Sequence, residues 1–213
     1  MRIDVFTLVP HAFAWLTEQQ PIAGILGTEL ELRLVNYRDT TPLRAGQVDD
    51  EPYGGGAGMV LRVDVVAAAL ETLYGDGPPS RVVALTPQGR PLTQPVVEEL
   101  AEETHLTLLS ARFEGFDERI VEHLASDAIS VGPYVLSNGD LPAMILLDAV
   151  ARRLPGALAE GSGEVESFSE ELGGGLEYPH YTRPAEFRGW KVPDVLLSGD
   201  HARIESWRRE NVR

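Results

Sequence analysis

Glycines and acids cluster in residues 49–60, where side chains are few and the backbone is bare. Asp49 and Asp50 open this segment, Tyr53 precedes the glycines, and Gly58 is the last of them. Glycine lets a backbone, a base or a phosphate approach closely, and it reaches positive φ at little steric cost. A Walker-type phosphate cradle is excluded, because neither Lys nor Ser/Thr follows Gly58. The segment is therefore either a surface turn or a contact element.

Three other segments carry polar residues and glycines just after predicted buried strands: 86–89, 111–115 and 132–139. In a parallel sheet, ligands bind beyond the carboxyl ends of the strands. Each segment alone could be an ordinary turn. Because all three follow strands, we expect them to meet at one edge of the sheet and to form a ligand pocket.

Alternating strand and helix patterns predict the elements that position these loops. Short apolar or β-branched runs predict strands at 3–8, 29–35, 81–86, 105–110 and 128–131. Helical spacing predicts helices at 12–18, 63–74, 93–103, 117–125 and 141–153. This alternation predicts an α/β fold with a mostly parallel sheet that is covered on both faces.

The composition of the 213 residues is that of an ordinary globular protein, with 43% hydrophobic and 24% charged residues. The absence of cysteine excludes disulfides and thiolate metal sites, and it fits a cytoplasmic protein. No apolar run approaches the length that crosses a membrane, and residues 1–5 are typical of a strand and not of a signal peptide. We therefore expect a cytoplasmic protein without a membrane partner.

The net charge of −15 argues at first against a nucleic-acid partner, since phosphates would be repelled. The charge is unevenly distributed. Residues 181–213 hold seven basic and five acidic side chains, a net charge of +2, so residues 1–180 carry −17. The charge pattern permits a polyanion to contact the C-terminal part of the chain.

Several segments, taken in order, resemble one family. They are 49–60, 85–90, 112–119, 134–144, 177–184, 190–193 and 197–201, followed by Trp207 and Arg208. This set resembles the bacterial tRNA (guanine-N1)-methyltransferase TrmD family of the SPOUT class. Motif order across nearly the whole chain is far more specific than any single motif. The resemblance implies a C-terminal trefoil knot in the α/β domain, a small mainly helical C-terminal unit, a homodimer, and activity supported by Mg²⁺.

The resemblance also implies a methyl transfer from S-adenosylmethionine (SAM) to N1 of the guanine 3′ of the anticodon in tRNA, position 37. It assigns the SAM pocket to the strand-exit loops, where Glu114 would orient polar groups of the cofactor, although Glu114 could also be an ordinary loop acid. The residues expected to bind SAM are Leu85, Thr86, Pro87, Ala111, Phe113, Glu114, Val131, Gly132, Pro133, Tyr134, Val135, Leu136, Asn138, Gly139 and Pro142.

Two residues take the catalytic roles that the resemblance implies. Guanine N1 carries a proton at neutral pH, so a carboxylate must remove it during methyl transfer. A cation near O6 would then stabilise the negative charge on the base. By position, Glu166 is the expected base and Arg152 the expected cation. The alternatives are a solvated linker acid for Glu166 and a cation at a helix C-terminus for Arg152.

The expected domains are a SAM-binding knotted domain at 1–155, a flexible acidic, glycine-rich linker at 156–176, and a tRNA-binding unit at 177–213 that is short for the family. The partner subunit and the tRNA are expected at the glycine segment and the C-terminal unit. Each residue assigned to RNA binding could equally be a solvated or capping residue. The assigned residues are Asp49, Asp50, Tyr53, Gly58, Arg183, Lys191, Ser198, His201 and Arg208.

The chain departs from the family pattern at several of these positions. Glu166 stands where the family has Asp, and its extra methylene moves the carboxylate. Ala111 stands in place of Gly, which is unfavourable if the position requires positive φ. Phe113 replaces Tyr, Pro133 removes a backbone N–H, and Asn138 replaces Gly. Two other functions therefore stay open: a non-catalytic SAM-binding paralogue, and a methyltransferase acting on another RNA or a small acceptor.

Overall fold

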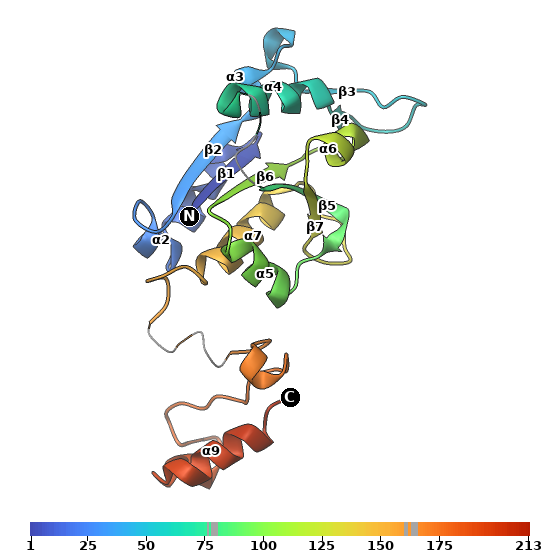
Figure 1. The fold of residues 1–213 in the computed structure, drawn as a ribbon. Coiled ribbons are helices and arrows are strands. Elements are labelled where there is room, and N and C mark those ends of the chain that lie inside the picture. Colours follow the sequence, from blue (N-terminus) through green and yellow to red (C-terminus); the bar gives the residue numbers. More distant parts are fainter. Residues whose placement is uncertain (76, 78–80, 160–161, 163–165) are drawn as a thin grey trace. The chain divides into compact units, whose positions relative to one another are not determined.

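The structure of the protein is a computed structural model that describes residues 1–75, 77, 81–159, 162 and 166–213. The chain divides into two compact units, Met1–Leu158 and Ala159–Arg213 (Figure 1). Each unit is described by itself below. Five residues of the predicted linker, 160–161 and 163–165, lie outside the described part.

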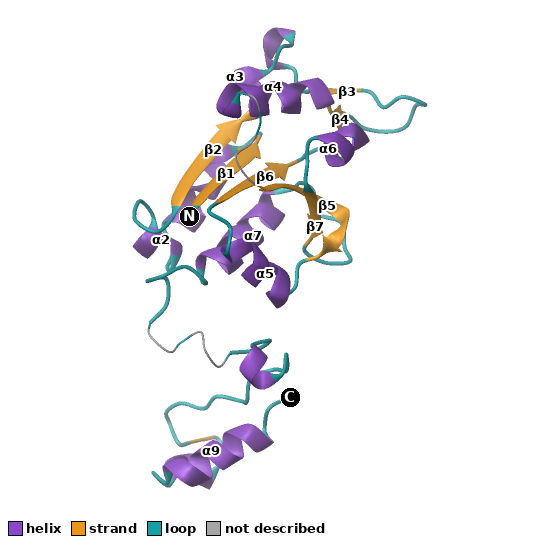
Figure 2. Cartoon of the chain, in the orientation of Figure 1, coloured by secondary structure: helices purple, strands orange, loops and turns teal. Residues whose placement is uncertain are grey.

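A five-stranded parallel sheet forms the centre of the first unit (Figure 2). Its strands are β1 (Arg2–Thr7), β2 (Glu31–Asn36), β5 (Arg81–Pro91), β6 (His105–Ser110) and β7 (Asp127–Ser130), in the order β2-β1-β6-β5-β7. Every neighbouring pair is parallel, as in the register Ile3↔Leu106 between β1 and β6. The predicted α/β fold with a mostly parallel sheet is confirmed.

Helices cover both faces of this sheet (Figure 1). One apolar cluster joins the sheet to η1 (Pro10–Phe13), α1 (Ala14–Thr17), α2 (Ile22–Ile25), α5 (Gln94–Ala101) and α7 (Asp140–Ala151). The other joins it to α3 (Tyr37–Thr40), α4 (Val63–Tyr74) and α6 (Glu118–His123). Alternate strand residues supply the two clusters, so Val5 belongs to the first and Phe6 to the second.

Strand β5 is longer than the sequence pattern predicts. We expected it to end at Thr86 before a turn at 87–89, but it continues to Pro91. Leu85 and Arg90 both pair with Ile129, so residues 86–89 bulge out of the ladder. Gly89 allows this close return, since a Cβ there would lie 2.6 Å from the carbonyl oxygen of Ala128. The Pro-Gln-Gly turn signal marks the bulge and not the strand end.

Short elements outside the sheet complete the first unit. The strands β3 (Asp49–Asp50) and β4 (Val60–Leu61) pair antiparallel on either side of the glycine segment, which makes that segment the loop of a hairpin. A 3₁₀ turn, η2 (Arg44–Gly46), precedes β3. These short elements carry too few residues for periodicity to predict them.

The second unit contains η3 (Glu170–Leu172), the antiparallel pair β8 (Glu186–Phe187) and β9 (Trp190–Lys191), and the helices α8 (Asp194–Leu197) and α9 (His201–Glu210). The second half of the predicted linker forms backbone hydrogen bonds with other residues of this unit. Leu176 and Arg213 exchange backbone hydrogen bonds of 2.6 and 3.0 Å. Among the described helices of the whole chain, none has the length and apolar character that a membrane crossing requires.

Candidate functional site

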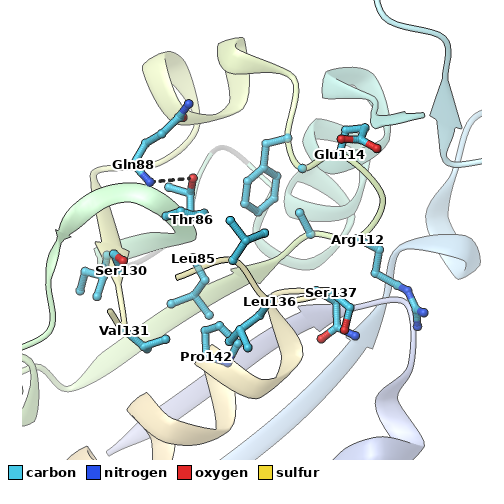
Figure 3. A pocket seen from close by; sticks show the side chains of 18 of the residues that line it. Leu85, Thr86, Gln88, Arg112, Glu114, Ser130, Val131, Leu136, Ser137 and Pro142 are labelled. Atoms are coloured by element: carbon cyan, nitrogen blue, oxygen red, sulfur yellow. Dashed lines mark hydrogen bonds between the residues drawn. The ribbon is translucent and has the colours of Figure 1, made fainter. Parts of the chain in front are cut away.

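A cavity of about 320 Å³ lies at the carboxyl edge of the sheet in the first unit (Figure 3). Its walls come from the bulge of β5, the end of β7, the loops after β6 and β7, α6 and the start of α7. The three predicted strand-exit loops therefore meet, as expected for a parallel sheet. Of the residues expected to bind SAM, all except Pro133 line this cavity.

One part of the cavity wall is apolar, and polar side chains lie around it (Figure 3). In Figure 3, Leu85, Leu136 and Pro142 lie together, and Glu114 lies apart from them across the cavity. The hydroxyl of Thr86 accepts a 3.4 Å hydrogen bond from the backbone of Gln88 within the β5 bulge. A cavity of this size lined by both apolar and polar groups suits a small-molecule ligand.

The loop after β6 forms a tight turn that has a strained residue at its tip. Gly115 donates a backbone hydrogen bond of 3.0 Å to Arg112, and Phe113 between them has φ of +62°. Positive φ is unfavourable for an aromatic residue, and such strain concentrates at ligand sites. Ala111 is buried and is not among the described residues with positive φ. The left-handed conformation falls on Phe113, so backbone conformation gives no reason against Ala111 at its position.

The loop after β7 folds back across the end of β6. Gly139 donates a 2.7 Å backbone hydrogen bond to Ala111, and a Cβ on Gly139 would lie 3.0 Å from the Cα of Ser110. The side chain of Asn138 accepts a 3.0 Å hydrogen bond from the backbone of Asp140, which forms an Asx turn just before α7. Asn138 makes this turn without adopting positive φ. The close approach of two loops defines this wall of the cavity.

The glycine segment is attached to the same site. Backbone hydrogen bonds join Glu114 to Met59 at 2.9 Å and Leu61 to Gly115 at 3.0 Å. Gly58, with φ of +83°, packs against Glu114 so closely that a Cβ would lie 2.6 Å from the Cγ of that side chain. The base of the glycine segment thus forms an outer layer behind a cavity wall, while Tyr53 at its tip is 99% exposed.

The predicted catalytic residues do not line the cavity. Arg152 follows the last residue of α7, whereas Gly139 and Pro142 at the other end of that helix face the cavity. At 1.5 Å per residue, Arg152 is roughly 18 Å along the helix from its start. Glu166 belongs to the second unit, where its carbonyl accepts a 3.0 Å hydrogen bond from Ser169.

The residues predicted to bind RNA fall into two groups. In the first unit, Asp49 and Asp50 form β3, and Asp50 accepts a 2.8 Å hydrogen bond from Arg62. In the second unit, Arg183, Lys191, Ser198 and His201 are exposed.

Several of these side chains have partners within the chain. Lys191 lies 3.7 Å from Glu186, and Arg208 stacks over the ring of Tyr178 at 5.1 Å. Ser198 donates to Val195 at 2.7 Å and accepts from Asp200 at 3.2 Å, so it has a capping role within the unit.

The sequence reasoning missed several residues of the site. Gln88, Arg112, Ser130 and Ser137 line the cavity without having been predicted. Gln88, Arg112 and Ser137 lie inside the predicted loops, which was a sufficient signal for them, whereas Ser130 lies in the predicted strand 128–131. Asp140 was also missed. It is buried next to the cavity loop and is considered separately below. Within the described ranges, no group of three or more His, Cys, Asp or Glu side chains could hold a metal ion.

Comparison with known proteins gives one consistent family. Residues 1–213 match the family model described as tRNA (Guanine-1)-methyltransferase TrmD. The chain is 53% identical to a tRNA (guanine-N(1)-)-methyltransferase of Brevibacillus brevis (strain 47) over 220 residues, which cover 100% of this chain and 87% of that protein. It is 49% identical over 217 residues to proteins of the same name from Bacillus cereus (strain AH820) and Bacillus anthracis (strain CDC 684), covering 88% of each.

Proposed function

The chain belongs to the tRNA (guanine-1)-methyltransferase TrmD family, and from this premise we propose how its residues carry out methyl transfer to N1 of guanine in tRNA. The observation that carries the proposal is the cavity at the carboxyl edge of the sheet, which gathers the loops that the resemblance assigned to the cofactor. The target we propose is the guanine 3′ of the anticodon, position 37.

We propose that this cavity binds SAM. Its volume lies in the range of small-molecule sites, and its apolar side suits a flat base. Glu114 adds a carboxylate that suits a cationic group of the cofactor. Pro133 does not line the cavity and would act only by shaping the loop that contains it. When bound, SAM supplies an electrophilic methyl group on a sulfonium.

Glu166 and Arg152 are the residues we propose for proton transfer and charge stabilisation. The carboxylate of Glu166 accepts the proton from guanine N1, which frees the nitrogen lone pair for attack on the methyl group. The guanidinium of Arg152 stabilises the negative charge that develops on O6. The proton leaves Glu166 to water after the transfer. Because this base stands where the family has Asp, its longer side chain must be accommodated by the segment around it.

A homodimer would bring these groups to the cavity. Arg152 and the cavity lie at opposite ends of α7, so Arg152 is badly placed for the cavity of its own chain. Leu141 and Ile145, on the exposed side of the same helix, are 51% and 45% exposed. An apolar helix face of this kind favours contact with a second copy. We propose that two chains pair through α7 and that each supplies Arg152 to the cavity of the other.

The knot and the domain division are part of the same proposal. The chain after β7 crosses the end of β6 before entering α7, and β5 returns against β7 after its bulge. This crossing supports a trefoil knot in residues 1–155. We propose that residues 156–176 link this domain to a tRNA-binding unit at 177–213.

We propose that two parts of the chain contact RNA: the glycine segment of the first unit and the C-terminal unit. Asp49, Asp50, Tyr53 and Gly58 would contact the tRNA or the partner subunit through the exposed glycine segment. In the C-terminal unit, Arg183, Lys191, His201 and Arg208 would contact phosphates, and Ser198 would support that surface as a cap. The cytoplasm, where tRNA is modified in bacteria, is the proposed location.

The expectation that Mg²⁺ supports activity comes from the family resemblance alone. The described side chains form no group that fits a metal ion, so no step proposed above uses one. Titration with EDTA in the methyl-transfer assay, followed by restoration with Mg²⁺, measures whether activity depends on the ion.

Methyl transfer from radiolabelled SAM tests the proposed function. The acceptors are a tRNA transcript with guanine 3′ of the anticodon and the same transcript with that base changed to adenine. We expect label only in the first transcript. Equal labelling of both, or no labelling by a protein that binds SAM in a calorimetric titration, would contradict the proposal.

A further inference from the structure

Asp140 is a buried acid that has no place in the mechanism above. It is only 3% exposed, and it begins α7 directly after Asn138 and Gly139, which line the cavity. Asp140 itself does not line the cavity. Acidic side chains are almost never fully buried unless they are paired, so this position calls for a physical explanation.

The contacts of Asp140 join two strands of the sheet. Its Oδ1 atom accepts a 2.6 Å hydrogen bond from the hydroxyl of Thr7 and a 2.7 Å hydrogen bond from the hydroxyl of Ser110. Thr7 is the last residue of β1, and Ser110 is the last residue of β6. Hydrogen bonds from hydroxyls to a carboxylate at these lengths are of the strong, charge-assisted kind. One carboxylate oxygen thus holds the start of α7 to two neighbouring strand ends.

The same attachment determines where the cavity loop lies. The loop closes on Asp140 through the 3.0 Å hydrogen bond to Asn138, and Gly139 bonds to Ala111, the residue after Ser110. A Cβ on Gly139 would be crowded, because it would meet the backbone of Ser110 and Ala111 at 3.0 Å. A shift of Asp140 relative to Ser110 would therefore move Gly139 and Ala111, which both face the cavity.

The arrangement leaves one carboxylate oxygen of Asp140 unsatisfied. Within the described residues, Oδ2 of Asp140 is buried and has no hydrogen-bond partner in the chain. A buried unsatisfied carboxylate oxygen opposes folding. Residues that oppose folding in this way persist where they serve a site.

We propose that Asp140 is a positioning residue that holds the cavity loop 131–139 against the ends of β1 and β6, so that the affinity for SAM depends on it. The proposal rests on the proposed function only in taking SAM as the ligand of the cavity. Asp140 acts through Asn138, Gly139 and Ala111 and does not touch the reacting atoms.

Asp140→Asn tests this role, and Asp4→Asn is its matched control. Asp4 is also a fully buried acid of the sheet, with hydrogen bonds to Tyr74 at 2.6 Å and His105 at 2.8 Å. It lies three residues before Thr7 on β1 and on the other face of the sheet. SAM affinity is measured by calorimetry, kcat and KM by methyl transfer to tRNA, and folding by thermal melting.

We expect Asp140→Asn to weaken SAM binding at least tenfold and to raise KM for SAM similarly, with kcat at saturating SAM within threefold of the parent. Asp4→Asn should lower the melting temperature at least as much as Asp140→Asn does. It should leave the affinity for SAM within twofold of the parent. Ser110→Ala and Thr7→Val remove one donor each, so each should weaken SAM binding about threefold or more.

A folded Asp140→Asn protein with unchanged SAM affinity would overturn the proposal. An equal loss of SAM affinity in Asp4→Asn would also overturn it, because the effect would then follow stability alone. If Asp140→Asn does not fold, unchanged SAM affinity in both Ser110→Ala and Thr7→Val overturns the proposal. Absence of SAM binding by the parent protein would instead contradict the proposed function, and the role of Asp140 with it.

Discussion

At the level of single residues, Arg152 and Glu166 carry the proposed chemistry. Each has a close counterpart in the chain that is outside the proposed mechanism. Arg153 follows Arg152 at the same helix end and lies 3.8 Å from Glu98. Glu171 is an exposed acid five residues after Glu166. These neighbours separate a specific role from a general effect of charge.

Arg152→Ala and Glu166→Gln should each lower kcat by about 10²-fold or more, the usual contribution of one general base or one charge-stabilising group. SAM affinity should stay within threefold, because both residues are proposed to act on the guanine and not on SAM. Single-turnover kinetics and a SAM titration measure the two effects. Arg153→Ala and Glu171→Gln should keep nearly full activity. A fully active Glu166→Gln protein would show that Glu166 is not the general base.

Asp4 illustrates a charged residue whose role is stability. Burial alone would raise the pKa of Asp4, but hydrogen bonds from Tyr74, Arg2 and His105 favour the ionised form and lower the pKa below its usual value. Burial, followed by the hydrogen bond to Asp4, raises the pKa of Tyr74. Both carboxylate oxygens of Asp4 are occupied by this network, in contrast to Asp140.

The lowered pKa of Asp4 predicts how stability changes with pH. A carboxyl with a lower pKa in the folded state adds stability above its unfolded pKa of about 3.9, and this contribution is lost as pH falls through the folded value. Asp4→Asn should therefore reduce the free energy of unfolding by about 1–3 kcal/mol at pH 7 and by less at pH 3. Urea unfolding at both pH values measures this, with the exposed Asp39→Asn as the control. An equal loss at both pH values would contradict it.

At the level of elements, the glycine segment is a hairpin loop whose base is attached to the cavity wall. Its base is held to Glu114 and Gly115 by backbone hydrogen bonds of Met59 and Leu61. Two of its glycines have nearly the same φ, +83° for Gly58 and +78° for Gly55. Only Gly58 faces a neighbour, since nothing lies within 4 Å of a Cβ placed on Gly55.

Gly58→Ala should weaken SAM binding severalfold, because the new methyl group must displace Glu114 from the cavity wall. Gly55→Ala imposes the same left-handed strain, which costs about 1–2 kcal/mol, without that displacement. SAM titration and thermal melting of both variants separate strain from displacement. Equal SAM affinity in the two variants would show that the Gly58–Glu114 contact has no effect on the cavity.

At the level of the whole molecule, the proposed active site requires two chains. The reason is the length of α7, which separates Arg152 from the cavity at its other end. The exposed apolar side chains of Leu141 and Ile145 lie on the same helix. A dimer through this face would cover them and would explain both observations.

Mixing two inactive proteins tests whether Arg152 acts on the partner's cavity. One carries Arg152→Ala, and the other carries Leu136→Glu, which places a charge at the apolar side of the cavity. After dissociation and random re-association, half of the dimers are mixed and each has one intact site, so about a quarter of the parent activity should return.

No recovery, with mixed dimers verified by differently tagged chains, would show that Arg152 acts within its own chain. Leu141→Glu should give a monomer in light scattering and an inactive enzyme. Leu26→Glu, at an exposed apolar residue outside α7, is the control and should remain dimeric and active.

The sequence by itself determined the order of strands and helices, the parallel sheet and the loops that form the cavity. These features follow from patterns with periods of two and 3.6 residues and from turn residues next to them, which are local properties of the chain. The strand-exit motifs identified most of the cavity for the same reason. The family assignment used the order of these motifs and needed no coordinates.

Only the tertiary structure decided which distant residues meet. It showed that positive φ falls on Phe113 and not Ala111, that Gly58 packs against Glu114, and that Asp140 bonds to Thr7, 133 residues earlier in the chain. It also showed Arg152 at the far end of α7 from the cavity. The physical reason is that such contacts depend on strand order and on how closely loops cross, which no local pattern encodes.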